Sequence, residues 1–358
     1  MIIRLSESPI ATEVLYTHLC RTLSGAQPDD SAWTPSDWER FTRLAQAENV
    51  APRLYAIWRE AGFPAGLPPE QQARFSQAYF QSGGRSALFR TELAKIGALF
   101  AQAGIDCLPL KGAALAGTLY PDPATRPMND LDLLVRPQHL RRALGILRRL
   151  GYSLENFTYH AVLWGPVFVE LHWSLPYPQA ARRQPPEPWF WQKQAVSGTQ
   201  PPFDALLLHA IVHQQVQNRG QAPLLSRLDL LYLAQALGPD YDWPALQSRA
   251  GEFGWEPAYA AALRGVEQRF PGHLPTAALA ALPAESVESA PHSTLNPRDR
   301  YTASAWRHLD LLTRLQAALG LVFPGRGYML WRYHPRPAWL WPLWYPLRWG
   351  GLVRGLRA

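Results

Sequence analysis

The pattern of hydrophobic residues changes at about residue 104 and again after residue 173. Outside this stretch, apolar residues recur every three or four positions, as in amphipathic helices. Inside it, short apolar or alternating runs predict strands at 105–110, 129–135 and 152–173, with helices at 113–120 and 138–150. The order strand, helix, strand, helix, strands predicts an α+β fold, with helices on one face of a small mixed sheet.

This change of pattern divides the chain into five expected parts. The region between the sheet and the later helices is expected to be a linker, because residues 174–202 hold seven prolines and no clear periodicity. The parts are a helical N-terminal region (1–103), an α+β core (104–180), a Pro-rich linker (181–202), a helical C-terminal domain (203–325) and an Arg- and Trp-rich tail (326–358).

Composition favours a near-neutral body over a nucleic-acid-binding surface. The chain has 358 residues, 47% of them hydrophobic, and two cysteines without a CxxC pattern, which excludes a disulfide scaffold and a cysteine zinc site. Residues 298–358 hold ten arginines against two aspartates, which gives +8, so the chain total of +7 leaves −1 for the first 297 residues. Nucleic-acid polymerisation is therefore disfavoured.

The chain ends suggest a cytoplasmic protein with one segment suited to a membrane surface. The N-terminus lacks the basic start and the unbroken apolar run of a secretory signal, and no apolar stretch reaches 18 residues. Residues 338–353 combine several tryptophans with flanking arginines but are interrupted by two prolines and Arg348. Two interpretations stay open: the tail packs on the protein's own helices, or it contacts the inner membrane face peripherally.

Three carboxylates on the predicted strands are the candidate chemical centre. Asp130 and Asp132 lie two residues apart on one strand, so they are expected to share a face, and Glu170 shares a face with His172 on a later strand. If these strands pair, the three carboxylates converge and could hold two Mg²⁺ ions. The alternative is an ordinary edge strand with a solvated face, because a DxD pattern alone is a weak signal.

The residues around these carboxylates make the signal more specific. The segment resembles the nucleotidyltransferase superfamily that includes DNA polymerase β, and more closely a bacterial family of nucleotidyltransferases within it. The resemblance covers about residues 105–175, and more loosely 203–250. The matching elements are Leu110-Lys111-Gly112, Tyr120, Arg126, DLDLLV from Asp130 to Val135, Gly151-Tyr152 and ELHW from Glu170 to Trp173.

The resemblance implies a polymerase-β-like fold and a role for each matching residue. Asp130, Asp132 and Glu170 would bind the metal ions, and Glu170 would help to deprotonate the acceptor hydroxyl. Lys111 and Gly112 stand where the superfamily usually has a Gly-Ser pair that holds the β- and γ-phosphates. Here the ammonium group and the backbone at glycine would take over that role, the alternative being a solvated lysine at a helix start.

Five further residues each have two interpretations. Arg126 would neutralise phosphate charge or form a salt bridge that orders its loop. His172 would orient the acceptor or hydrogen-bond within the sheet. His209 and His213, four residues apart without the glutamate of a zinc-protease motif, would pack between helices or face the acceptor. Asp229 would join two helices or line the acceptor pocket.

The predicted function is Mg²⁺-dependent transfer of a nucleoside monophosphate from a nucleoside triphosphate to a hydroxyl of a small molecule, sugar, peptide or protein. The alternative is a catalytically weak nucleotidyltransferase-like accessory module that binds a partner or a membrane surface in a biosynthetic pathway. The three carboxylates favour catalysis, whereas the missing hydroxyl and the tail favour the accessory module. The chain has no Walker A, GxGxxG or GxSxG motif.

Overall fold

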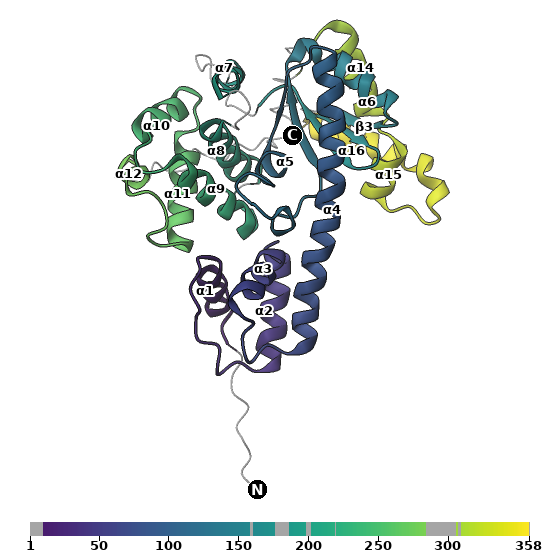
Figure 1. Cartoon of the computed structure of the whole chain (residues 1–358). Coiled ribbons are helices and arrows are strands. Elements are labelled where there is room, and N and C mark those ends of the chain that lie inside the picture. Colours follow the sequence, from purple (N-terminus) through teal and green to yellow (C-terminus); the bar gives the residue numbers. More distant parts are fainter. Residues whose placement is uncertain are drawn as a thin grey trace.

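A computed structural model describes residues 10–157, 160–175, 186–197, 202–218, 220–283, 306 and 309–357. Figure 1 shows a sheet at the centre, with a group of helices on one side of it, a second helical group on the other side, and the N-terminal helices below. The mixed architecture confirms the predicted α+β fold class, but helices pack on both faces of the sheet and not on one face as predicted, because both faces carry buried apolar side chains. Among the described residues, no helix combines the length and the apolar character that crossing a membrane requires.

The N-terminal helices begin and end at clear local signals. Helix α2 starts with a capping box, in which the Thr34 hydroxyl accepts from the Asp37 backbone N–H and the Asp37 carboxylate accepts from the Thr34 backbone N–H. Each bond satisfies an amide that the first helical turn leaves without a partner. The helices of this region are α1 (Thr12–Leu23), α2 (Pro35–Ala47), α3 (Ala51–Ala61) and α4 (Pro69–Gln102).

Helix α4 connects the N-terminal helices to the sheet. Its 34 residues span about 50 Å. Phe75, near its start, is buried among the N-terminal helices, whereas Ile96 and Phe100, near its end, are buried against the sheet and α6. One helix therefore takes part in both hydrophobic cores of the protein.

The sheet has five strands in the order β1-β2-β5-β4-β3, and β2 pairs with β5 in parallel while the other pairs are antiparallel. Two of its elements are shorter than predicted, since Asp130 lies just before β2 and the helix predicted at 113–120 ends at Leu115. The elements of this region are β1 (Cys107–Pro109), α5 (Lys111–Leu115), η1 (Pro123–Thr125), β2 (Leu131–Val135), η2 (Pro137–His139), α6 (Leu140–Arg149), β3 (Ser153–Phe157), β4 (His160–Trp164) and β5 (Phe168–His172).

Alternation along the strands gives each sheet face its own core. Leu131, Leu133 and Val135 of β2 pack with α4 and α6, as the alternating pattern predicts. Leu134 points the other way, into a core shared with α8–α11 and the N-terminal helices. The carboxylate face of the sheet is therefore covered by C-terminal helices, on the opposite side from α15 and α16 (Figure 1).

The C-terminal helices begin earlier than predicted. Helix α7 lies inside the segment that the prolines indicated as a linker, because Trp191 and Phe190 are buried and hold it on the core. The last elements form a separate group that contacts β3. The helices are α7 (Glu187–Ser197), α8 (Phe203–Val212), the π-helical turn η3 (His213–Gln217), α9 (Leu224–Leu237), α10 (Trp243–Glu252), α11 (Glu256–Arg269), α12 (Thr276–Ala280), α14 (Leu311–Val322), α15 (Arg326–Tyr333), η4 (Ala338–Trp344) and α16 (Tyr345–Arg357).

The capping box of α2 gives a test of this local structure. Replacing Thr34→Ala removes the side-chain acceptor, and we expect the free energy of unfolding to fall by about 1 kcal/mol in urea titrations. Thr91→Ala is the matched control, because the Thr91 hydroxyl only donates to the Ala87 carbonyl within α4 and alanine suits an exposed helix interior. An equal loss in both variants would contradict a specific role for the cap.

Candidate active site

The register of the parallel strands sets the centre of the site. Asp132 of β2 lies directly beside Glu170 of β5, so two strands that are far apart in the sequence place carboxylates on one face. This pairing confirms the expected convergence of the strands. One carboxylate oxygen from each of Asp132 and Glu170 and one ring nitrogen of His172 lie within 4.8 Å of one another.

The neighbouring antiparallel strand adds a second histidine. His160 of β4 lies opposite His172 in the register, and the ring centroids are 5.1 Å apart. The His160 Nε2 atom is 3.5 Å from a Glu170 oxygen, and the His172 Nε2 atom is 3.0 Å from Asp132 Oδ1. His172 therefore hydrogen-bonds within the sheet, which is one of the two roles expected for it. His160 was not predicted, because nothing in the sequence fixes which residue of β4 faces Glu170.

Lys111 supplies the positive charge nearest to these carboxylates. Its Nζ atom is 2.7 Å from Asp132 Oδ1 and 4.0 Å from Glu170 Oε2. The Lys111 backbone has φ 47°, in the left-handed region that non-glycine residues rarely adopt and that costs about 1–3 kcal/mol. The ion pair and the start of α5 together hold this conformation, so the lysine is fixed at the site and is not a solvated residue.

The carboxylates differ in protonation because their surroundings differ. Burial would raise the pKa of Asp132, but Lys111 and the hydrogen bond from His172 outweigh it and hold that pKa well below its usual range. His160, His172 and Lys111 likewise outweigh burial at Glu170 and lower its pKa to about 2. Burial and the neighbouring charge of Asp132 raise the pKa of Asp130 to about 7. The site therefore carries more negative charge than Lys111 neutralises.

Two further histidines, His209 of α8 and His213 of η3, lie within electrostatic range of Lys111 and Asp132. Burial, followed by the charge of Lys111, lowers the pKa of His209 well below its usual value and that of His213 to about 3, so both imidazoles are neutral. Among the described residues, the buried Nδ1 atom of His209 has no hydrogen-bond partner. A buried polar atom without a partner costs free energy, which a bound ligand could recover.

Arg126 and Asp229 form a buried ion pair that joins the loop before β2 to helix α9. The Arg126 Nη2 atom is 2.6 Å from Asp229 Oδ2, and the Tyr120 hydroxyl donates to Asp229 Oδ1 at 2.8 Å. Of the two interpretations of Arg126, the structure shows the salt bridge that orders its loop. Asp229 is bound by Tyr120 and Arg126 from the segment before β2, so it joins this segment to α9 and not one helix to another.

Gly112 is required by the close approach of that same loop. A Cβ atom at Gly112 would overlap the Arg126 guanidinium and would lie 2.6 Å from the Met128 Cγ atom. The resemblance implied that glycine allows a phosphate to approach the backbone. In the structure, the space beside Gly112 is filled by Arg126 and Met128, so this glycine positions the loop that leads to Asp130.

The donor set fits a hard divalent cation. Asp132 and Glu170 offer carboxylate oxygens, which Mg²⁺ prefers, and burial together with the charge of Asp132 raises the pKa of Asp130, a cost that a bound cation would relieve. His172 adds a nitrogen donor, which Mn²⁺ also accepts. Lys111 occupies the same oxygen of Asp132, so a metal ion would have to share that oxygen with the lysine or displace it.

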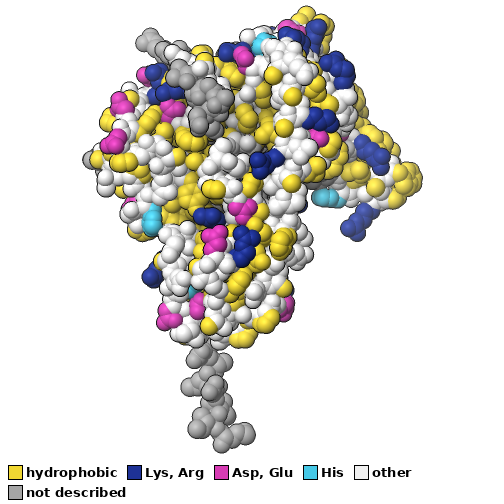
Figure 2. Space-filling view, viewed as in Figure 1, with side chains coloured by type: hydrophobic (Ala, Val, Ile, Leu, Met, Phe, Trp, Pro, Cys, Tyr) yellow, Lys and Arg dark blue, Asp and Glu magenta, His cyan; other side chains and the backbone are white. Residues whose placement is uncertain are grey.

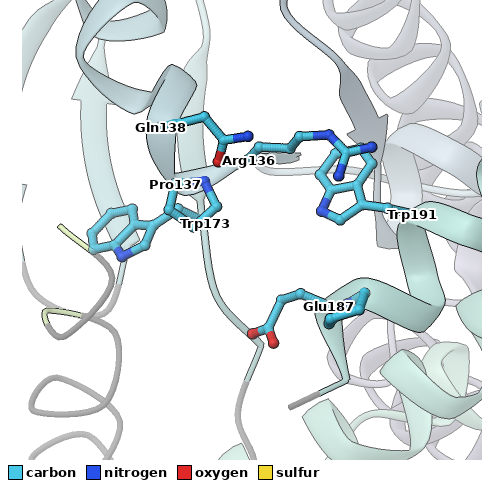
Figure 3. Close-up of a pocket in the computed structure, with 7 residues that line it drawn as sticks. Arg136, Pro137, Gln138, Trp173, Glu187 and Trp191 are labelled. Carbon is cyan, nitrogen blue, oxygen red and sulfur yellow. The ribbon is translucent and has the colours of Figure 1, made fainter.

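A separate cavity of about 240 Å³ opens beyond the ends of β2 and β5 (Figure 3). Arg136 stacks over the Trp191 ring at 4.6 Å, Trp173 lies on the other side, and Glu187 lies at the third side. Arg136 follows Asp132 by four residues, or about 13 Å along an extended chain, so the cavity is a neighbour of the carboxylate site. The lining residues are Arg136, Pro137, Gln138, Trp173, Glu187, Pro188 and Trp191.

A mixed sheet that aligns Asp132 with Glu170 beside a Lys-Gly turn defines a site of the nucleotidyltransferase class. Residues 34–271 match a protein family described as uncharacterised nucleotidyltransferase, and the chain belongs to this family. The solution structure of the antibiotic-resistance factor ANT(2″)-Ia is similar over 52% of this chain and 97% of that chain, at 14% identity and a TM-score of 0.32, which is a remote likeness. No curated protein sequence matches the chain.

The buried ion pair gives a prediction for stability. Asp229→Asn leaves the Arg126 charge buried without a counterion, so we expect the free energy of unfolding to fall by about 3–5 kcal/mol. The exposed pair of Arg249 and Glu252 is the matched control, and Glu252→Gln should cost less than about 0.5 kcal/mol. Urea titrations of both variants measure the difference, and similar small losses would show that Asp229 does not anchor the loop.

Proposed function

We propose that this protein transfers a nucleoside monophosphate from a nucleoside triphosphate to a hydroxyl group of an acceptor. The observation that carries the proposal is the register that sets Asp132 beside Glu170, with Lys111 at 2.7 Å from Asp132. Membership of a nucleotidyltransferase family supports the reaction class.

Mg²⁺ is the proposed cofactor, held by Asp130, Asp132 and Glu170. Bound there, one or two ions would neutralise the triphosphate and polarise the acceptor hydroxyl. The oxygen donors of Asp132 and Glu170 support this assignment, as does the charge of Asp132 close to the buried Asp130 carboxyl, which a cation would balance. His172 would hold Asp132 in place through its 3.0 Å contact.

Lys111 is proposed to bind phosphate oxygens when a triphosphate enters. Asp132, Glu170 and Asp130 together outweigh burial and raise the pKa of Lys111, so the side chain stays charged at neutral pH. A metal ion on Asp132 would compete with the ammonium group for the same oxygen, and the flexible side chain could then turn to a phosphate. Arg126 is less suited to this role, because Asp229 already binds its guanidinium.

The acceptor is proposed to enter between the sheet and helix α8. Glu170, ionised and only partly buried, would orient the acceptor hydroxyl, and neutral His209 and His213 would line the opposite wall. The cavity beside Trp173 and Trp191 has the aromatic character that suits an organic group on the acceptor or the nucleotide.

A direct test combines labelling with substitutions at the carboxylates. The protein is incubated with Mg²⁺ and each of the four nucleoside triphosphates labelled at the α-phosphate, together with the products of neighbouring genes, to find what becomes labelled. Asp130→Asn and Asp132→Asn should each weaken Mg²⁺-dependent triphosphate binding at least about a hundredfold in calorimetry, because they remove metal ligands. Chelation with EDTA should have the same effect on the unmodified protein.

Asp29→Asn is the matched control for these variants, because Asp29 lies exposed in the N-terminal region and accepts from the nearby Ser31. Circular dichroism checks that each variant is folded. Unchanged binding in both folded site variants would remove the metal-carboxylate proposal.

Lys111→Gln separates the two roles of the lysine. Without the ammonium group, Asp132 is freed, so Mn²⁺ alone should bind more tightly, while a triphosphate should bind about tenfold more weakly. Calorimetric titrations with the metal alone and with the metal and triphosphate measure both effects. Lys95→Gln, which removes an exposed lysine 3.5 Å from Glu92 on α4, should change neither. A parallel loss of both affinities would contradict the proposed exchange.

A further inference from the structure

The C-terminal elements carry most of the exposed large hydrophobic side chains. Of the thirteen such side chains among the described residues, nine lie between residues 311 and 349. On the face seen in Figure 2, the projection formed by α15, η4 and α16 is covered by hydrophobic and basic side chains. The nine residues are Leu311, Leu312, Leu315, Leu319, Phe323, Trp339, Leu343, Leu347 and Trp349.

Helix α14 turns its leucines away from the protein. Leu311, Leu315 and Leu319 are spaced by four residues, so they share one helix face, and each is more than half exposed. The opposite face buries the small side chains of Thr313 and Ala317 where α14 packs on β3. In an ordinary surface helix the large apolar side chains face the core. This orientation leaves an apolar stripe without a partner in the described structure.

The exposed side chains are presented by elements that are fixed to the sheet. The Glu155 carboxylate on β3 accepts from the Tyr328 backbone N–H, and its backbone carbonyl accepts from Gly325. Phe323 at the end of α14 contacts the Trp349 ring, with centroids 5.7 Å apart. Part of this segment therefore packs on the protein, and this packing joins α14 to α16. The nine large hydrophobic side chains nevertheless stay exposed.

The charge on this surface has one sign. Between residues 309 and 357 the sequence has seven arginines and one acidic residue, Asp310. The Asp310 carboxylate caps α14 by accepting from the Thr313 backbone and hydroxyl. Arg326, Arg332 and Arg336 are exposed beside the apolar side chains. Leucine and tryptophan with arginine, without free carboxylates, complement a surface that is both apolar and anionic.

We propose that α14, α15, η4 and α16 dock the protein onto the surface of an anionic phospholipid bilayer. The leucines and tryptophans would enter the boundary between headgroups and acyl chains, and the arginines would contact lipid phosphates. This docking surface lies on the other side of the sheet from α8, so a bilayer bound there would not contact the helices that cover the carboxylate site. The inference does not depend on the reaction that the site performs.

Sedimentation of the full chain with vesicles tests the proposal. We expect binding to vesicles with about 30 mol% phosphatidylglycerol in phosphatidylcholine, and much weaker binding to phosphatidylcholine alone. Raising NaCl from about 0.05 M to about 0.5 M should lower the bound fraction several-fold, because salt screens the arginines. Equal, low sedimentation with and without anionic vesicles would overturn the proposal.

Substitutions separate the apolar and the charged contributions. Leu311→Ser, Leu315→Ser and Leu319→Ser combined should weaken vesicle binding at least about tenfold without unfolding, since these side chains are exposed. Arg326→Gln, Arg332→Gln and Arg336→Gln combined should remove the preference for phosphatidylglycerol. Phe80→Ser with Leu88→Ser is the matched control, because both side chains are exposed on α4, and it should bind like the unmodified chain.

Two further results would overturn the proposal. Light scattering that shows a dimer in solution, converted to a monomer by the leucine substitutions, together with no vesicle binding, would make a second copy the occupant and overturn the proposal. Vesicle binding by the triple leucine variant equal to that of the unmodified chain would also overturn it.

Discussion

The site depends on one constraint, the parallel register that places Asp132 and Glu170 side by side on a covered sheet face. Asp132 is 1% exposed, and a buried carboxylate next to another is unfavourable unless cations or donors compensate it. Lys111 and His172 supply that compensation, and the low pKa of Asp132 measures its strength. The left-handed backbone conformation of Lys111 is tolerated because the ion pair with Asp132 fixes the lysine side chain.

The same constraint explains why the helical layer is attached to the sheet by charged groups. The loop between α5 and β2 must hold Asp130 beside Asp132, and Tyr120 and Arg126 fasten that loop to Asp229 on α9. Gly112 leaves the space that the Arg126 side chain fills. A residue on α9, about a hundred positions later in the sequence, therefore fastens the loop that leads to Asp130.

Much of this arrangement could be predicted from the sequence, because alternation and spacing report which face a residue occupies. They predicted the strands and the shared face of Asp132 and Glu170. They could not predict what depends on three-dimensional register. The position of His160 beside Glu170 and the pairing of Arg126 with Asp229 arise only when distant segments meet. Prolines at 185–188 indicated a linker, and burial of Trp191 overrides them in α7.

Lys111 links the stability of the site to its proposed chemistry. Without a metal ion, the ammonium group is the closest counter-charge to Asp132, and removing it would leave a buried carboxylate uncompensated. A triphosphate with its divalent ion brings both the positive charge that Asp132 needs and the negative charge that Lys111 needs. Such an exchange of partners would keep both Asp132 and Lys111 paired with an opposite charge. A lysine can make this exchange more easily than an arginine, because its ammonium group is a compact charge on a flexible chain that is not tied to one planar partner.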